Sequence, residues 1–429
     1  MRTLLRKVRL MPECGFGDGC VDVLVDGTRI AEIAPAITPN SGDSVVDGRG
    51  DLLLPGLVNT HCHAAMTLFR GYGEDLPLSR WLNERIFPAE DKLTVESVYW
   101  GSMLAIAEML RNGVTSFSDM YFFCDSTANA VLESGIKANR SRSLVSFDPT
   151  LKPADDSRFA EAVSLVQNFH GEGDGRLRVD MSIHAEYTNL PDYCRAVGEY
   201  TAAHGLGMQL HLSETEDEHN ACIARHGKTP AAFFADLGVF DAPTTAAHCV
   251  YVTDEDIAIM AEKGVTAAHN PTSNLKLGSG VMPLRRLIDG GINVTLGTDG
   301  AASNNTLDVL RELRLAAILH KGVNRRADIT TAAEMLPLAT VNGAKAQGRP
   351  DCGSIAVGQR ADLILLDLSV PHNMPVYDLA ATVAYSAEAS DVRMTMVDGR
   401  ILYAVGASTS IDIERLRSEA GRVLTHYFD

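Results

Sequence analysis

The sequence predicts an α/β protein built on one (β/α)8 barrel with a small composite β domain. Apolar runs of strand length alternate with amphipathic helical stretches through most of the chain. Short strands bounded by turns precede this alternation and return after it. The chain has 429 residues, and α/β barrels often exceed the usual domain size as one unit, so a barrel with a smaller annex fits the length.

The two ends of the chain predict the annex. Residues 1–56 and 350–410 both contain short β-like runs separated by turns such as D-G-T, and we expect them to form one composite β-sandwich domain. The catalytic barrel is then expected over residues 57–349, and a terminal helix over residues 411–429. The strand candidates of the annex lie at 21–25, 30–33, 51–56, 353–367 and 394–403.

The middle of the chain predicts eight barrel strands with helices between them. The first helix begins at Val95 and should stop at Asn112-Gly113, since Asn and Gly commonly end helices. Strand and helix alternating eight times indicates a closed barrel. The strand candidates are L-V-N-T-H-C-H at 57–63 and the runs at 114–119, 144–147, 179–184, 208–211, 244–248, 265–269 and 294–299.

Composition favours a small-molecule substrate. The net charge of -17 opposes general binding to nucleic acid or anionic membrane, which depends on clustered Lys and Arg. The eight cysteines are scattered, with no C-x-x-C pair, as expected for reduced thiols. There is no run of ~18 apolar residues and no signal-peptide pattern. We expect a cytoplasmic protein that could form a homo-oligomer.

The pair His61 and His63 ends the first barrel strand. Side chains at i and i+2 of a strand point to the same face, so the two imidazoles can meet at one point while Cys62 faces away. Such a pair suits metal chelation, but two hydrogen-bonded histidines at the edge of a core would give the same pattern. The pair alone leaves both interpretations open.

The other strand ends favour a metal site. In a parallel barrel the carboxyl ends of the strands meet at one rim, where catalytic groups lie. Catalytic zinc sites use roughly three or four imidazole and carboxylate ligands and leave a position open for water. His61, His63, His211 and Asp299 supply such a set. The residues at the ends of the later runs are His184, His211, His248, His269 and Asp299.

Glu214 follows His211 by three residues, where the loop after the strand could bend its carboxylate over the metal. A metal ion activates water for attack, but a carboxylate is still needed to carry the proton to the leaving group. Glu214 is the candidate for that role, although an isolated Glu here could also be a solvated helix N-terminal residue. His248 could orient the attacking water, whereas His269 could simply shape its loop.

These motifs resemble the amidohydrolase superfamily, and within it the methylthioadenosine/S-adenosylhomocysteine deaminases. The resemblance rests on N-T-H-C-H, H-L-S-E, A-H-C, H-N-P-T-S-N-L-K-L-G and G-T-D-G-A-A-S-N-N, and it extends to V-G-Q-R-A-D-L. It implies one divalent ion, usually Zn²⁺ with Fe²⁺ or Mn²⁺ as alternatives, held by His61, His63, His211 and Asp299. It also implies that Asp299 takes a proton from the water and that Glu214 contacts the purine ring and shuttles protons to it.

The resemblance also implies substrate contacts. Glu90 of P-A-E-D matches a carboxylate that accepts hydrogen bonds from the two ribose hydroxyls, and a carboxylate has the two acceptor oxygens needed. His184 matches a residue that contacts the purine, and Arg142 matches an arginine facing the 5′ side, which should favour an acceptor or carboxylate there. Arg158 and Glu186 have no firm counterpart, although Glu186 is an acid where the family often has proline.

The expected activity is hydrolytic deamination of the adenine ring of 5′-modified adenosines, such as S-adenosylhomocysteine and 5′-methylthioadenosine. The alternative is another mononuclear aminohydrolase of the superfamily, acting on guanine-type or triazine substrates, or a chlorohydrolase. Glu90 opposes these because a bare heterocycle offers no ribose diol. A barrel that binds nucleosides without turnover is a further alternative, but Glu214 and all four ligand candidates are present.

Overall fold

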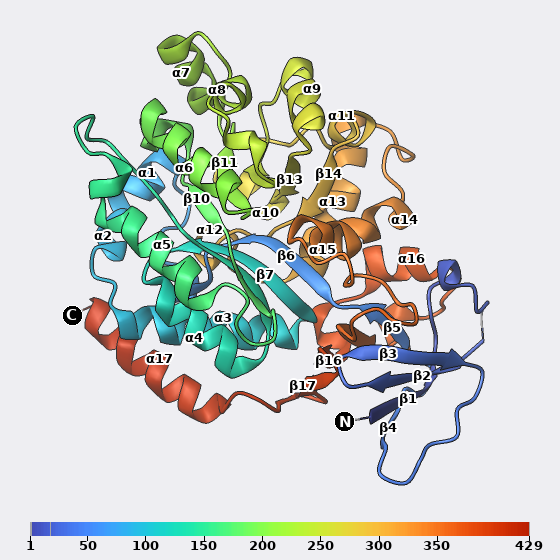
Figure 1. The fold of residues 1–429 in the computed structure, drawn as a ribbon. Helices are drawn as coiled ribbons and strands as arrows, with labels where there is room; N and C mark the ends of the chain where they lie inside the picture. The colour runs from blue at the N-terminus through green and yellow to red at the C-terminus, as the bar shows by residue number, and fades with distance from the viewer. Residues whose placement is uncertain (1, 18, 429) are drawn as a thin grey trace.

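The computed structural model describes residues 2–17 and 19–428. Figure 1 shows a central barrel with a β annex beside it and a C-terminal helix, α17 (Ile413–Phe428), that returns to the barrel and packs near α3 (Val95–Arg111). None of the helices in the described residues is long and apolar enough to cross a membrane.

Parallel strands at eight positions form the barrel, which confirms the predicted fold class. The fourth position is interrupted at Asp180 and is divided into β9 and β10. Closure occurs between the last strand and the first, where Thr60 Oγ1 donates to Leu296 O at 2.8 Å and Asp299 N to His61 O at 3.0 Å. The strands are β6 (Leu57–Cys62), β7 (Val114–Tyr121), β8 (Lys137–Arg142), β9 (Leu177–Val179), β10 (Met181–Ile183), β11 (Met208–Leu212), β12 (Thr244–His248), β13 (Thr266–His269) and β14 (Asn293–Leu296).

The third strand was predicted in the wrong place. The apolar run 144–147 is irregular, with Phe147 69% exposed, and the strand is the polar segment Lys137–Arg142. Its charged side chains are buried because each has a partner: Lys137 Nζ lies 2.5 Å from Asp362, and Arg140 Nη1 lies 3.0 Å from Asp119. Hydrophobicity alone does not reveal a strand whose inward residues are neutralised by tertiary ion pairs.

The helix that begins at Val95 is confirmed. Thr94 and Ser97 form a reciprocal capping box, in which Ser97 N donates to Thr94 Oγ1 at 3.1 Å and Thr94 N donates to Ser97 Oγ at 2.8 Å. Asn112 is the C-cap, and Gly113 follows with φ +83°, a left-handed conformation that suits glycine. Both ends of this helix therefore follow from local sequence.

The remaining helices surround the barrel or lie in its loops. The longer ones are α4 (Cys124–Ser134), α5 (Ser157–Phe169), α6 (Pro191–Ala203), α7 (Glu216–His226), α8 (Pro230–Asp236), α9 (Asp254–Lys263) and α13 (Val309–Asn324). The short ones are α1 (Leu78–Trp81), α2 (Phe87–Glu90), α10 (Pro271–Lys276), α11 (Leu284–Asp289), α12 (Ala301–Asn304), α14 (Ala332–Met335), α15 (Val341–Ala346) and α16 (Leu379–Ala381).

The annex contains two sheets, of order β3-β2-β1-β4 and β18-β17-β16-β15-β5. The second sheet combines both ends of the chain, because β5 from the N-terminal segment pairs antiparallel with β15. The annex differs from prediction in detail: the segments Arg2–Val8 and Ser44–Asp47 form strands that were not predicted, and only Leu363–Leu366 of the run 353–367 is a strand. The strands are β1 (Arg2–Val8), β2 (Val21–Asp26), β3 (Arg29–Ala34), β4 (Ser44–Asp47), β5 (Leu52–Pro55), β15 (Leu363–Leu366), β16 (Val392–Val397), β17 (Arg400–Ala404) and β18 (Ala407–Ser408).

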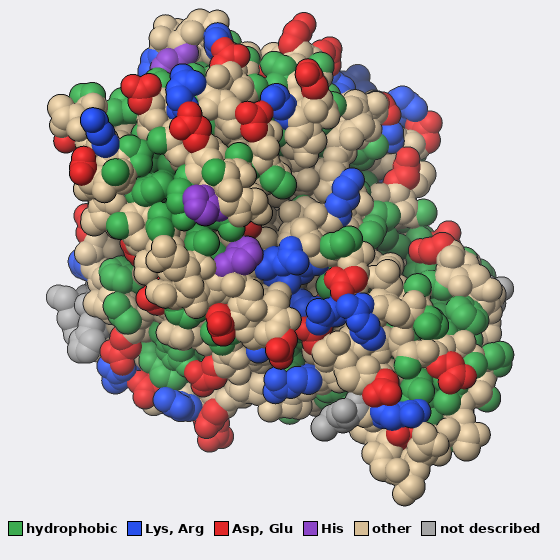
Figure 2. Space-filling model, viewed as in Figure 1, with side chains coloured by type: hydrophobic (Ala, Val, Ile, Leu, Met, Phe, Trp, Pro, Cys, Tyr) green, Lys and Arg blue, Asp and Glu red, His purple; other side chains and the backbone are tan. Residues whose placement is uncertain are grey.

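The domain boundaries at 56, 349 and 410 stay predictions, and residues 1, 18 and 429 of those ranges lie outside the described residues. Buried charges join the annex to the barrel: Lys137 Nζ of β8 also lies 2.7 Å from Asp398 Oδ1, which follows β16. On the face drawn in Figure 2, acidic and basic side chains are interspersed.

Candidate metal centre

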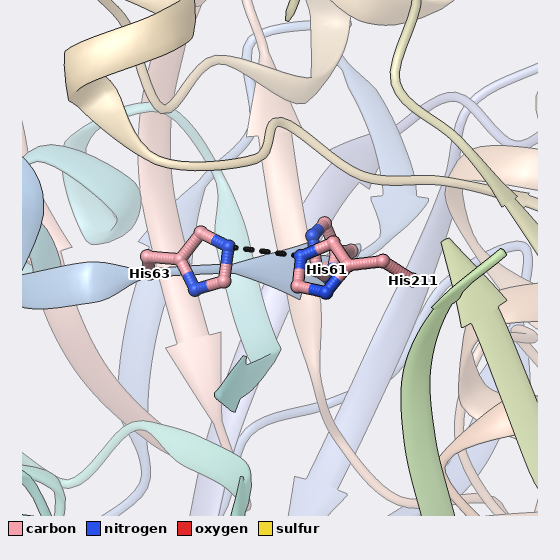
Figure 3. A group of neighbouring side chains, drawn as sticks. All are labelled: His61, His63 and His211. Carbon is pink, nitrogen blue, oxygen red and sulfur yellow. Dashed lines mark hydrogen bonds between the residues drawn. The ribbon is translucent and has the colours of Figure 1, made fainter. Parts of the chain in front are cut away.

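Three histidines converge at the carboxyl rim of the barrel. His61 and His63 come from the end of β6, and His211 comes from β11 on the other side of the barrel (Figure 3). His63 Nε2 lies 3.4 Å from His211 Nε2, and one nitrogen from each of the three residues lies within 4.8 Å of the others. The i, i+2 pair thus faces one point together with His211.

Backbone carbonyls orient two of these rings. Nδ1 of His63 lies 2.6 Å from Met120 O, and Nδ1 of His211 lies 2.6 Å from His184 O. A carbonyl only accepts, so each Nδ1 carries the proton and donates it, which leaves Nε2 directed at the centre. Nε2 of His61 is buried without a hydrogen-bond partner among the described residues. Converging buried nitrogens of this kind fit a metal ion.

Asp299 completes the cluster. Its Oδ1 lies 3.2 Å from His63 Nε2 and 3.6 Å from His61 Nε2. The same oxygen accepts a hydrogen bond from Gly300 N at 2.8 Å, and Oδ2 accepts from Ser273 Oγ at 2.6 Å and Ser303 Oγ at 3.0 Å. The carboxylate is therefore held on one side by hydroxyl donors and presented to the histidines on the other.

Gly297 allows the Asp299 loop to approach β6. A Cβ at Gly297 would lie 2.8 Å from His61 Cβ and 2.4 Å from Asn270 Oδ1, closer than real contacts permit. Asp299 itself has φ +62°, and His248 has φ +74°, so two functional candidates occupy the left-handed region that non-glycine residues rarely adopt. The glycine of G-T-D is thus explained by close packing against a ligand candidate.

The electrostatics of the cluster favour a cation. Burial alone would raise the pKa of Asp299, but the adjacent His61 and His63 imidazoles hold it well below its usual range. Burial lowers the pKa of His61 to about 4 and holds that of His211 well below 6.5, so both rings are neutral at pH 7. Burial also opposes protonation of His63, yet Asp299 raises its pKa to about 9. The carboxylate therefore attracts positive charge, which a proton or a metal ion can supply.

Glu214 lies beside this cluster next to His248. Its Oε2 is 3.7 Å from His248 Nε2, and its Oε1 accepts a hydrogen bond from Ser279 Oγ at 3.0 Å. His248 Nδ1 lies 2.8 Å from Asn274 Oδ1, so this nitrogen donates and Nε2 is left as an acceptor. Burial raises the pKa of Glu214, which makes it more able to hold a proton near neutral pH.

Glu218 holds the backbone of Glu214, and sequence reasoning missed it. One carboxylate oxygen accepts from Ser213 N at 3.0 Å and the other accepts from Glu214 N at 2.8 Å. Ser213 has φ +46°, so the turn after β11 is strained and is held in place by these two hydrogen bonds. Ser273, Ser303 and Asn274 were also missed. All four residues act through contacts that sequence spacing does not show. The only local signal for Ser273, Ser303 and Asn274 was their place in H-N-P-T-S-N and G-A-A-S-N-N.

Glu90 and His184 lie near the cluster. Burial raises the pKa of Glu90 to about 7, while a hydrogen bond with Tyr121 and the charge of His63 oppose this shift. The ring centroid of His184 is 4.8 Å from that of His211, and burial lowers the pKa of His184 to about 3. A neutral imidazole at this position can donate or accept a hydrogen bond without bringing charge to a substrate.

Arg142 ends β8 and is engaged by an acid. Its Nε lies 2.7 Å from Glu161 Oε2, and its guanidinium stands 5.0 Å from the centroid of the Phe122 ring.

The three unassigned residues have structural partners. Glu186 is paired with Arg225 and with His226, whose Nε2 lies 2.9 Å from its Oε1. Arg158 is paired with Asp156 at 2.9 Å. His269 lies outside the cluster, and its Nε2 is 3.0 Å from His320 Nε2.

Comparison with known proteins agrees with this arrangement. The model of the Amidohydrolase family matches residues 52–402. The chain is 42% identical over 422 residues to a 5-methylthioadenosine/S-adenosylhomocysteine deaminase of Moorella thermoacetica, covering 97% of this chain and 98% of the relative. It is 43% identical over 398 residues to a 5'-deoxyadenosine deaminase of Methanosarcina mazei, covering 93% and 91%.

Two solved structures share the fold. An adenosine deaminase from Xanthomonas campestris with bound zinc superposes with a TM-score of 0.93 at 33% identity, covering 99% of this chain and 98% of that one. Atrazine chlorohydrolase from Arthrobacter aurescens in complex with zinc gives a TM-score of 0.89 at 25% identity, covering 98% and 100%. The histidine-rich cluster is thus a metal site on a fold whose relatives bind zinc.

The serine clamp on Asp299 predicts a loss of metal affinity. In the double variant Ser273→Ala, Ser303→Ala, Oδ2 loses both hydroxyl donors, and we expect about 10- to 100-fold weaker metal binding, the usual effect of removing groups that orient a ligand. Competition with a chelating dye measures it. Ser102→Ala is the control, because Ser102 is also buried but bonds Thr127 away from the cluster. Equal affinities in all three proteins would contradict the prediction.

Proposed function

Because the chain belongs to the amidohydrolase family, we propose that it hydrolytically deaminates the adenine ring of 5′-modified adenosines. The protein is a metal-dependent hydrolase and a deaminase. The proposed substrates are S-adenosylhomocysteine, 5′-methylthioadenosine, 5′-deoxyadenosine and adenosine, which are converted to the inosine analogue and ammonia. The names of the relatives support this substrate class.

The observation that carries the proposal is the position of Glu214. A buried carboxylate with a raised pKa lies beside His248 and next to the histidine–aspartate cluster. Hydrolytic displacement of an amine from an aromatic ring needs such a group, because the ring nitrogen must gain a proton as water adds to the neighbouring carbon.

We assign the metal to His61, His63, His211 and Asp299, as one divalent ion, most often Zn²⁺. Bound there, it would supply Lewis-acid activation of water. Asp299 Oδ1 is the oxygen that faces the histidines, so it is positioned to take a proton from that water, while Ser273 and Ser303 hold Oδ2 away from the reaction.

The remaining steps belong to Glu214 and His248. Protonated Glu214 would donate its proton to N1 of the purine as Asp299 takes one proton from the water and the water oxygen adds to C6. The proton on Asp299 would then pass to the exocyclic amine, the C6–N bond would break and ammonia would leave. The remaining hydroxyl proton would return to Glu214 as the C6 carbonyl forms. His248, with Nδ1 held by Asn274, presents Nε2 as an acceptor that orients the water. Glu218 fixes the backbone from which Glu214 acts.

Substrate contacts are assigned to Glu90, His184 and Arg142. Glu90 would accept hydrogen bonds from both ribose hydroxyls, a role that requires its ionised form and so strengthens above the pKa of about 7. His184 would contact the purine beside His211, and Arg142 would face the 5′ substituent. The likeness to a chlorohydrolase at 25% identity keeps a triazine-type hydrolase as the alternative, and Glu90 separates the two because it needs a diol.

A substrate screen tests the function. We expect ammonia release from adenosine and its 5′-methylthio, 5′-deoxy and homocysteine derivatives, and a much lower rate with free adenine, which lacks the diol for Glu90. Guanine and a chlorotriazine complete the panel. Turnover of either of these, with none of the nucleosides used, would replace the proposed function by the alternative.

Metal analysis of the same purified protein should return about one divalent ion per chain, because the donors available at the cluster suffice for one catalytic site. Dialysis against a chelator should remove activity, and Zn²⁺ should restore it. Two ions bound per chain at high occupancy would contradict the mononuclear assignment.

Replacing Glu214 tests the proton shuttle. Glu214→Gln keeps the size and the Ser279 contact but cannot carry a proton, so kcat should fall by at least about 10²-fold while metal content is unchanged. The control is Glu216→Gln, an exposed acid in the first turn of α7. Turnover close to wild type in Glu214→Gln would transfer the role to another group, with His248 examined first.

A further inference from the structure

The environment of Arg142 bears on which 5′ groups the site accepts. Arg142 lies at the carboxyl end of β8, on the rim where the metal cluster lies, and its side chain is 11% exposed. Glu161 reaches it from α5 and is itself 37% exposed, so this ion pair is only partly screened by solvent. The pair lies at the level of the site without belonging to the cluster.

The contacts of the guanidinium leave little capacity for a second carboxylate. A guanidinium binds a carboxylate in bidentate fashion along one of two edges, Nε with Nη2 or Nη1 with Nη2. Nε is taken by Glu161 Oε2 at 2.7 Å, and Nη1 donates to Ser143 O at 2.5 Å. Each edge has therefore already lost one donor, and an anionic group would have to displace Glu161 or bind through Nη2 with a second negative charge close by.

The other charges of this region also oppose an anion. Arg158, the second arginine on this side, is paired with Asp156. The pKa of Asp125, on α4, is raised mainly by burial and also by the negative charge of Glu161 nearby. Asp125 also lies near Arg140, which is itself paired with Asp119. Arg142 and Arg158 are therefore each already paired with an acid, Glu161 and Asp156. Glu186 does not add to them, because Arg225 and His226 neutralise it.

We infer that Glu161 is a specificity-determining residue that neutralises Arg142 and directs the enzyme toward nucleosides with uncharged 5′ substituents. The inference rests on the proposed function. Methylthio, hydrogen and hydroxyl groups at C5′ meet the Arg142–Glu161 pair without disturbing it. The homocysteine tail carries a carboxylate, which must compete with Glu161 for the same donors, so this substrate is disfavoured relative to the uncharged ones.

The test is the ratio of kcat/KM for S-adenosylhomocysteine to kcat/KM for 5′-methylthioadenosine. In Glu161→Gln, Arg142 keeps a polar neighbour but loses the competing charge, and we expect the ratio to rise by about 10-fold or more, as for gain of a hydrogen bond to a charged group. Adding Arg142→Met to Glu161→Gln should abolish that rise. Arg142→Met alone should change the ratio by less than about 3-fold, because Arg142 is already neutralised.

Glu334→Gln is the matched control. Glu334 is also paired with an arginine, Arg285, at 3.3 Å, but it belongs to α14, across the barrel from α5 (Figure 1), so the ratio should stay at the wild-type value. An unchanged ratio in Glu161→Gln would overturn the inference. A falling ratio would also do so, since it would mean that Glu161 binds the ammonium of the tail. If the wild type deaminates neither nucleoside, the proposed function itself is wrong. If it deaminates both and the ratio does not change in Glu161→Gln, only the inference about Glu161 is wrong.

Discussion

Closure of the barrel between β14 and β6 is the constraint on which the site depends. The bond from Asp299 N to His61 O joins the last strand end to the first and places a carboxylate against two imidazoles that lie 238 and 236 positions earlier in the chain. Gly297 permits this approach because no side chain stands between the strands. Removing the closure would separate the charges whose proximity holds the pKa of Asp299 low. The closure that completes the barrel therefore also sets the electrostatics of the centre.

A second consequence of the barrel is that backbone groups do much of the orienting. Met120 O and His184 O fix the rings of His63 and His211, and both carbonyls belong to neighbouring strand ends. Carbonyls of a rigid wall cannot titrate or change rotamer, so the direction of each Nε2 does not depend on pH. Side chains orient other groups of the site: a serine hydroxyl donates to the carboxylate of Asp299, and the carboxylate of Glu218 accepts from the backbone of the Glu214 turn.

Sequence reasoning recovered those parts of the molecule that are encoded locally. The ends of apolar strands revealed His61, His63, His211 and Asp299 because burial and chemistry coincide there. The prediction of the third strand was wrong, because the buried charges of Lys137 and Arg140 in β8 are neutralised by acids distant in sequence. It also missed partners that act across loops: Arg225 lies 39 residues from Glu186, and Ser273 lies 26 residues from Asp299. A pattern of single residues cannot show which distant charge neutralises which.

The residues assigned to catalysis and the residue assigned to substrate specificity lie on different elements of the fold. The groups assigned to bond making lie at strand ends, where a shift of one residue would turn the side chain to the opposite face. Glu161, in contrast, lies on α5, outside the strands, and pairs with Arg142 at the end of β8. On the proposed assignment, a substitution there would alter the charge offered to a 5′ group while the residues of the metal cluster keep their positions. Substrate preference would then change with the acid that partners Arg142, while the residues assigned to deamination stay the same.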